Sequence, residues 1–196
     1  MVDADPQRAM LRIELDASDW LFAENEDGPT RAQRIQHWHT STAPREQMDD
    51  AMRAWLELTL EALAPSNSDE LVAVHLPSMA ASPTTVRVRF TTDIPTCELD
   101  LDEVVRRSLG NTVEPPKVEP HAAVQLGRGV RAVGFRSRGP GRELDGSLAF
   151  GFRAGQIVVS VLCANADFGA LVRHASAVME FVDAISIVNT NEEGSS

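Results

Sequence analysis

The sequence predicts an α+β fold in which helices pack on an antiparallel β-sheet of about six or seven strands. The main observation lies in residues 121–188, where consecutive strand patterns are followed by one amphipathic helix pattern. Turn-forming residues separate these strand patterns, so neighbouring strands are expected to run antiparallel. The chain has 196 residues, 43% of them hydrophobic, which is enough for one domain with its own core. We therefore expect a single domain over residues 1–196.

The N-terminal section, residues 1–65, is expected to combine one strand with two helices. Apolar and polar residues alternate over residues 11–15, which predicts a half-buried strand. Residues 16–29 have no regular period and predict a loop anchored by aromatic residues such as Trp20. A short helix is predicted over residues 30–39.

A longer helix is predicted over residues 43–63. Pro44 suits the first turn of a helix, and Thr42 or Ala43 would then occupy the cap position. Apolar residues recur along this segment at helical spacing and form a wide stripe. The helix is expected to bury that stripe against the rest of the domain.

The second section, residues 70–188, is expected to supply the sheet. Two of its strands are expected to pair across the turn Gly127-Arg128-Gly129. The last strand is apolar on both faces, which is typical of a central strand covered on both sides. The strand patterns cover residues 72–76, 86–90, 122–126, 130–138, 147–152 and 157–163.

Two helices complete this section. Asp100 is a suitable cap for a short helix over residues 100–109. A closing helix is predicted over residues 167–185, with its apolar side toward the sheet. The polar residues 189–196 are expected to form a frayed tail.

Charge is unevenly distributed along the chain. The net charge is −11, which argues against double-stranded nucleic acid as a partner. Residues 1–70 carry fifteen acidic residues against six arginines, whereas residues 118–143 carry two acidic residues against five arginines. The chain has a single lysine, Lys117, and this composition indicates a GC-rich genome such as that of an actinobacterium.

Several features favour a cytoplasmic protein. The N-terminus has no apolar segment of the kind found in signal peptides. No apolar run approaches the ~20 residues that a membrane-spanning helix needs. Cys97 and Cys163 are the only cysteines, and we expect both to be reduced thiols, with Cys163 buried in a strand.

The strands over residues 130–163 and the segment 181–188 resemble the Mog1/PsbP-like group of α/β/α sandwiches, and among its bacterial members the LpqN-like and DcrB-like proteins. The resemblance covers about a third of the chain and includes no specific motif. It implies a Mog1/PsbP-like sandwich with a binding or chaperone-like role. It implies no catalytic residues and no cofactor.

The residues themselves show no catalytic signature. The chain contains no Gly-x-Ser-x-Gly, and its glycine pairs neither follow a strand nor open a helix as phosphate loops do. His37 and His39 could share a metal on a strand, but the surrounding residues favour a helix or loop, where we expect a surface or packing pair. His75, His121 and His174 are isolated and are expected to be partly buried. We expect neither enzymatic activity nor a bound metal or cofactor.

The best candidate site is a set of arginines on the predicted strands. Arg87 and Arg89 share one strand face, Arg136 and Arg138 share another, and Arg153 lies at a hairpin end. If these strands are neighbours, the arginines form one surface. That surface is either solvated, or paired with the acidic N-terminal section, or open to a carboxylate- or phosphate-bearing partner.

Two functions follow from these observations. The first is a non-enzymatic adaptor or chaperone-like module that uses the arginines and the acidic N-terminal section to bind a protein partner, which could be acidic. In the other case, in which the arginine face is not open to a partner, the acidic residues 24–27 fold over the arginines. Trp38 and Trp55 could present exposed apolar surface for a homodimer.

The alternative function is binding of a small ligand in a pocket between the C-terminal strands and the closing helix. The pocket would require a cavity of several hundred Å³, with Arg131 or Arg153 holding an anionic group. The predicted lining residues are Leu148, Phe150, Phe152 and Trp20.

Overall fold

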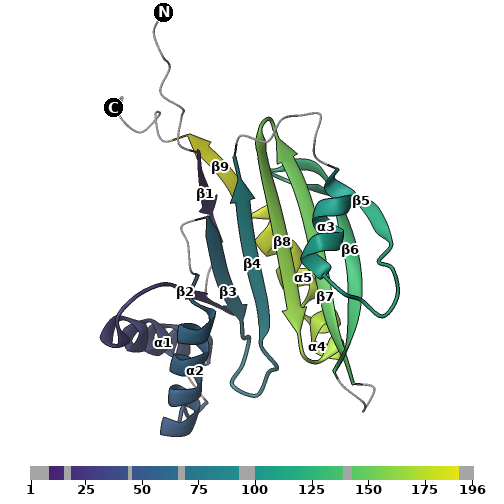
Figure 1. The fold of residues 1–196 in the computed structure, drawn as a ribbon. Helices are drawn as coiled ribbons and strands as arrows, with labels where there is room; N and C mark the ends of the chain where they lie inside the picture. The colour runs from purple at the N-terminus through teal and green to yellow at the C-terminus, as the bar shows by residue number, and fades with distance from the viewer. Residues whose placement is uncertain are drawn as a thin grey trace, which may run out of the picture.

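The computed structural model describes residues 9–15, 19–43, 46–65, 69–92, 100–138 and 143–189. Within them, helices lie on both faces of a seven-stranded antiparallel sheet, and a separate two-stranded sheet joins the first strand to the last (Figure 1). The predicted α+β class with an antiparallel sheet is therefore confirmed. No helix in the described part of the chain is long and apolar enough to cross a membrane.

The large sheet consists of two strand meanders joined at its centre. Each neighbouring pair of strands is antiparallel, and β8 occupies the middle position, as its apolar faces predict. The order is β2 (Trp20–Ala23), β3 (Glu70–His75), β4 (Thr84–Thr91), β8 (Ile157–Asn165), β7 (Glu143–Ala154), β6 (Gly127–Arg138) and β5 (Val118–Ala123).

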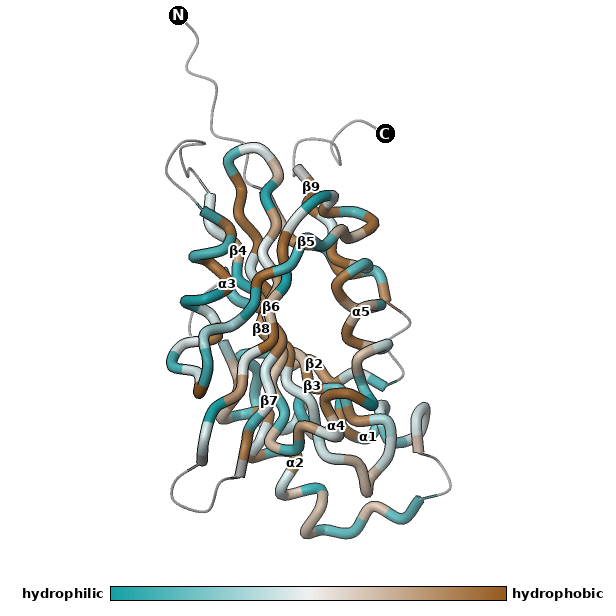
Figure 2. The backbone as a smooth tube through the Cα atoms, turned by 90° about the vertical axis from the view of Figure 1, so that its right-hand side faces the viewer, coloured by the Kyte–Doolittle hydropathy of each residue, from teal (hydrophilic) through white to brown (hydrophobic). Residues whose placement is uncertain are grey.

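Each face of the sheet has its own helical cover. Helices α4 (Phe168–Arg173) and α5 (Ala175–Asp183) cover one face, and α3 (Leu101–Leu109) covers the other (Figure 2). Phe150, Phe152 and Phe181 are fully buried between the sheet and α5, which places the main core on that side. A smaller core lies beneath Val105 and Leu109 of α3.

Helices α1 (Gly28–Thr42) and α2 (Asp50–Leu63) pack at the β2 end of the sheet (Figure 1). Helix α2 begins later than the predicted residue 43, because the Asp49 carboxylate accepts a hydrogen bond from Met52 N at 2.7 Å and caps the helix there. Pro44 lies outside the described residues. The side chain of Trp38, on α1, is buried in the core between α1 and the sheet, which corrects the expectation that it is exposed.

Two of the predicted segments differ from the structure near the chain ends. Residues 16–29 were expected to be a loop, but they contain β2, whose four residues are too few to show an alternating pattern. The closing helix is broken at His174, which caps α4 and precedes α5. The helix also ends before residue 185, because β9 (Ile185–Asn189) pairs with β1 (Ala9–Ile13).

The β5–β6 hairpin turns three residues earlier than predicted. Residues 124–126 form the turn, and Gly127, whose φ is 75°, begins β6 in a conformation that suits glycine. Gly129 therefore lies inside the strand, opposite Phe152. A Cβ at Gly129 would fall on the carbonyl oxygen of Gly151 and on the Phe152 ring.

We expect Gly129→Ala to lower the free energy of unfolding by about 2 kcal/mol or more, because the added methyl group has to displace backbone atoms. Chemical denaturation monitored by circular dichroism measures this change. Gly28→Ala is the matched control, since a Cβ at Gly28 has no neighbour within 4 Å. A Gly129→Ala protein as stable as the control would contradict this packing.

Candidate functional site

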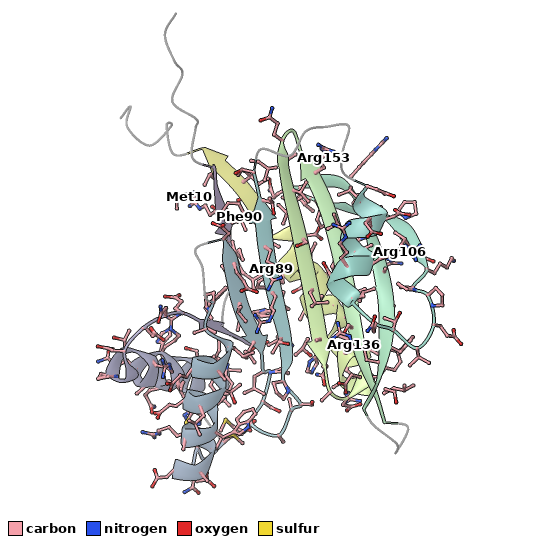
Figure 3. All side chains as sticks on the ribbon, viewed as in Figure 1. Met10, Arg89, Phe90, Arg106, Arg136 and Arg153 are labelled. Atoms are coloured by element: carbon pink, nitrogen blue, oxygen red, sulfur yellow. The ribbon has the colours of Figure 1, made fainter. Side chains whose placement is uncertain are left out.

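Four of the five arginines predicted to form a site lie on one face of the sheet, the face that α3 covers (Figure 3). Arg87 is opposite Leu162, and cross-strand partners share a face. Leu162 is opposite Ala149, which packs beneath α3. Alternation along each strand then places Arg89 and Arg153 on the same side.

Arg136 shares this face as well, but the arginines do not form one cluster. The strands β8 and β7 separate β4 from β6, which puts about 14 Å between the strands of Arg87 and Arg136. Arg136 also lies four residues along β6 from Ala132, the residue in register with Arg87. Helix α3 occupies the space between them. The side chain of Arg138 lies outside the described residues.

Arg87 and Arg89 have an acidic partner on the adjacent strand. Both guanidinium groups donate to one carboxylate oxygen of Glu70, at 3.0 and 3.1 Å, and the Glu70 side chain is only 7% exposed. One of the alternatives, that residues 24–27 fold over these arginines, is not what the structure shows. Glu24 and Glu26 instead accept hydrogen bonds from Arg34 on α1, and its hydrogen bond lowers the pKa of Glu24.

The remaining arginines of this face bind backbone carbonyl groups. Arg136 donates to Leu109 O at the C-terminal end of α3, where a cation is favourable. Arg153 donates to Gly155 O at 3.1 Å. Arg106 of α3, which the sequence analysis did not select, donates to Pro116 O at 2.9 Å. Arg136 and Arg106 therefore stabilise the position of α3 and its connector, whereas Arg153 binds within its own hairpin.

A cavity lies along the second half of β6, which β5 leaves unpaired because β5 begins only at Val118. Strand β6 has twelve residues, and the six-residue β5 pairs with only its first half. Continued pairing would place Pro115 and Pro116 opposite β6, but proline has no N–H to donate. The connector instead swings outward and returns to β6 at Val113, whose N–H donates to Phe135 O at 2.8 Å.

The outward swing opens a cavity of about 490 Å³, which we call the β6 slot. Its outer wall is the connector 114–117, and its inner wall belongs to β6, β7 and α5. Hydrogen bonds from Arg106 to Pro116 O and from Thr112 to Glu114 O fix the connector. The apolar lining residues are Val133, Phe135, Leu148, Ala175 and Met179.

The rim of the β6 slot carries two cations, Lys117 and Arg131, and two carboxylates, Glu114 and Glu119. Lys117 Nζ lies 2.8 Å from Glu119, whereas Arg131 approaches the other oxygen of Glu119 only to 3.4 Å. The hydrogen bond between Lys117 and Glu119 raises the pKa of the lysine and lowers that of the carboxylate. The weak contact leaves Arg131 able to bind another anion at the slot.

The β6 slot matches the predicted ligand pocket in part. Its volume and its position between the strands and α5 agree with the expectation, and Leu148 and Arg131 line it as predicted. Phe150, Phe152 and Trp20 are instead buried in the core. The sequence signal for the slot was the pair Pro115-Pro116 beside a long strand, which could be recognised only once the strand register was known.

The histidines form no metal site in the described residues, where no group of three potential ligands occurs. His37 and His39 lie on helix α1, and His37 is exposed. His75 and His174, which are far apart in sequence, pack edge to face with ring centroids 4.7 Å apart. Trp20 packs on His75 from another side, at 4.8 Å.

His174 is part of a buried hydrogen-bond network. Thr84 Oγ1 accepts a hydrogen bond from Asn165 Nδ2 at 2.8 Å, so its own proton can be donated to His174 Nδ1, also at 2.8 Å. Burial and the nearby Arg173 lower the pKa of His174, against the opposing effect of Asp167. Burial and the neighbouring His174 lower the pKa of His75 to about 4, although Asp19 opposes this shift.

These buried histidines predict an acid-sensitive fold. His75 titrates at about 4 in the folded protein, against an ordinary value of 6.5, so the unfolded chain binds more protons between these pH values. The free energy of unfolding is therefore retained above pH 6.5 and falls as the pH drops toward 4. The loss that His75 contributes is on the order of 3 kcal/mol.

Urea unfolding of the His75→Phe protein between these pH values tests this prediction. Phenylalanine keeps the aromatic packing and cannot be protonated, so the decrease in stability toward acid pH should be shallower than in the wild type. His37→Gln, which alters an exposed histidine, is the control and should keep the wild-type slope. Equal slopes for the His75→Phe and wild-type proteins would rule out His75 as the source.

Comparison with known proteins shows no close relative. No family model matches the chain, and no curated protein matches its sequence. A structure from Bacteroides thetaiotaomicron aligns with a TM-score of 0.42 and 6% identity, over 65% of this chain and 42% of its own. LpqN of Mycobacterium tuberculosis, described as involved in cell envelope biogenesis, aligns with a TM-score of 0.47 and 13% identity, over 95% of this chain and 87% of its own. The chain thus shows a weak resemblance to LpqN, as its C-terminal third predicts.

Proposed function

We propose that this chain is a non-enzymatic binding module that holds a small ligand in the β6 slot. The observation that carries this proposal is a cavity of about 490 Å³ with apolar walls between the sheet and α5. Small-molecule sites have volumes of roughly 300–1,000 Å³ and combine apolar walls with a few polar groups. The hydrogen bonds that fix the connector make the slot preformed, which reduces the entropic cost of binding.

The slot favours a ligand with an apolar body and one anionic group. Val133, Leu148 and Met179 offer apolar contacts. The preference for an anion rests on Arg131, which Glu119 contacts only at 3.4 Å, whereas Lys117 is held by Glu119 at 2.8 Å. Phe135 O points toward the connector, and alternation directs the N–H and C=O of Val133 to the same side. These backbone groups can orient the polar end of a ligand.

The second candidate is the adaptor or chaperone-like role with a protein partner. On the face that α3 covers, no described helix lies over β4 between α2 and α3 (Figure 1). Arg87 and Arg89 are on this face of β4. An acidic partner would have to compete with Glu70 for both guanidinium groups. This competition makes the arginine face a weaker candidate than the β6 slot.

Two fluorescent probes test the β6 slot. Anilinonaphthalene sulfonate has an apolar aromatic body and one anionic group, and phenylnaphthylamine is its uncharged counterpart. We expect the folded protein to bind both probes. Ala175→Trp, which fills the slot, should lower the affinity for both probes by about tenfold or more. Arg131→Gln should lower the affinity for the anionic probe several-fold and leave the affinity for the neutral probe unchanged.

Arg153→Gln is the charge-matched control, because Arg153 lies on the opposite face of the sheet from the slot. Circular dichroism melts verify that each variant is folded. If Ala175→Trp binds both probes as the wild type does, the probes bind elsewhere and the proposed site is wrong. If Arg131→Gln and Arg153→Gln weaken the anionic probe equally, the preference for an anion does not originate at the slot.

A further inference from the structure

Helix α2 carries two apolar stripes, and only one of them is buried. The inner stripe includes Leu56 and Leu60, which pack on β2, β3 and α1. The outer stripe is solvent-exposed, with Trp55 41% and Leu58 67% exposed. It consists of Ala51, Trp55, Leu58 and Ala62.

The spacing of the outer stripe is that of a helix–helix contact. Its residues follow one another at intervals of four, three and four positions. An alternation of three and four is the pattern by which one helix packs along another. A solvated helix face normally carries charged residues instead, so this face is suited to a second helix.

A groove runs beside the outer stripe. The loop between β3 and β4 supplies its other wall through Met79, Ala81 and Pro83, and the space between them is about 490 Å³. Glu46 accepts a hydrogen bond from Met79 N at 2.9 Å and so holds this loop at the start of α2. Methionine and tryptophan side chains on both sides of a groove can adapt to apolar anchors of different shape.

Carboxylates lie at one end of this groove and on the helix that forms its wall. Asp49, the cap of α2, lines the groove, and Glu46 binds Met79 N of the opposite wall. Asp50, Glu57 and Glu61 lie on α2, where Arg53 is the only base, and Glu61 is paired with Arg31 of α1. A second copy of this chain would bring two acidic rims together, which is unfavourable. A basic partner would instead be attracted to the rim.

We propose that α2 and the β3–β4 loop form a docking groove for a basic amphipathic helix of a partner protein. The groove lies at the β2 edge of the sheet, whereas the β6 slot lies near the β5 edge, so the two sites are separate. Trp55 and Leu58 are the anchors that the partner helix covers. The carboxylates at the groove end and on α2 select a partner with lysine or arginine flanking its apolar stripe.

Designed peptides of about 21 residues test this proposal, with leucine at the heptad core positions and either lysine or glutamate elsewhere. Fluorescence anisotropy of the labelled peptide measures binding to the full chain. We expect the lysine peptide to bind, with an affinity that falls as salt increases, and the glutamate peptide to bind at least about tenfold more weakly.

The double variant Trp55→Ser, Leu58→Ser separates docking from non-specific charge attraction, because it leaves every carboxylate in place. It should lower the affinity for the lysine peptide by about tenfold or more and leave the melting temperature of the protein close to that of the wild type. Val172→Ser is the matched control, since Val172 is 57% exposed on α4, away from the groove.

Three outcomes would overturn the proposal. The double variant could bind the lysine peptide as the wild type does, which would show that charge alone attracts the peptide. The glutamate peptide could bind as tightly as the lysine peptide. Sedimentation could also show a dimer of the wild type that the double variant dissociates, in which case the groove binds a second copy of this chain.

Discussion

The pairing of β4 with β8 is the contact on which the rest of the fold depends. Seven residue pairs, from Thr85–Ala164 to Thr91–Val158, join the N-terminal meander β2-β3-β4 to the C-terminal meander β5-β6-β7-β8. The pairing joins segments about seventy residues apart, whereas the other strand pairs of the large sheet, except β2–β3, are formed by strands that follow one another. Its register decides which side chains of the two meanders share a face, and so it places Arg87 and Arg89 on the same side as Arg136 and Arg153.

Prolines have opposite consequences in two parts of this sheet. In the connector, Pro115 and Pro116 prevent strand pairing, and the connector moves away from β6 and leaves a lined cavity. Pro120 lies inside β5 and is accommodated there, because β5 is an edge strand with one side free of a partner strand. A cavity formed by backbone that cannot pair keeps its shape without any side chain having to move, which suits a binding site.

The sequence predicted the regular elements well and the tertiary partners poorly. Alternation identified β4 and β7, because these strands are long enough to show the period, and a run apolar on both faces identified β8. Asp100 correctly marked the beginning of α3, where its side chain accepts a hydrogen bond from Asp102 N. The short strands β2 and β9 were missed, and the predicted closing helix extended to Ile185, the first residue of β9, since apolar runs of four or five residues fit either structure.

The candidate sites were predicted less well than the elements, for a physical reason. Glu70 became the partner of Arg87 and Arg89 only through the β3–β4 register, which local sequence does not determine. Four of the arginines do share one face, but the strand order β4-β8-β7-β6 separates them. The contact of His75 with His174 joins residues 99 positions apart and depends on how α5 lies on the sheet.

The small sheet of β1 and β9 determines how the fold responds to tension. Ala9 is opposite Asn189, so the chain enters and leaves the pair at the same end. A force that pulls the two ends apart acts across the ladder, and its hydrogen bonds break one pair after another instead of all together. The pair would therefore separate at low force like a zipper, up to Ile13 and Ile185, before the large sheet carries any load.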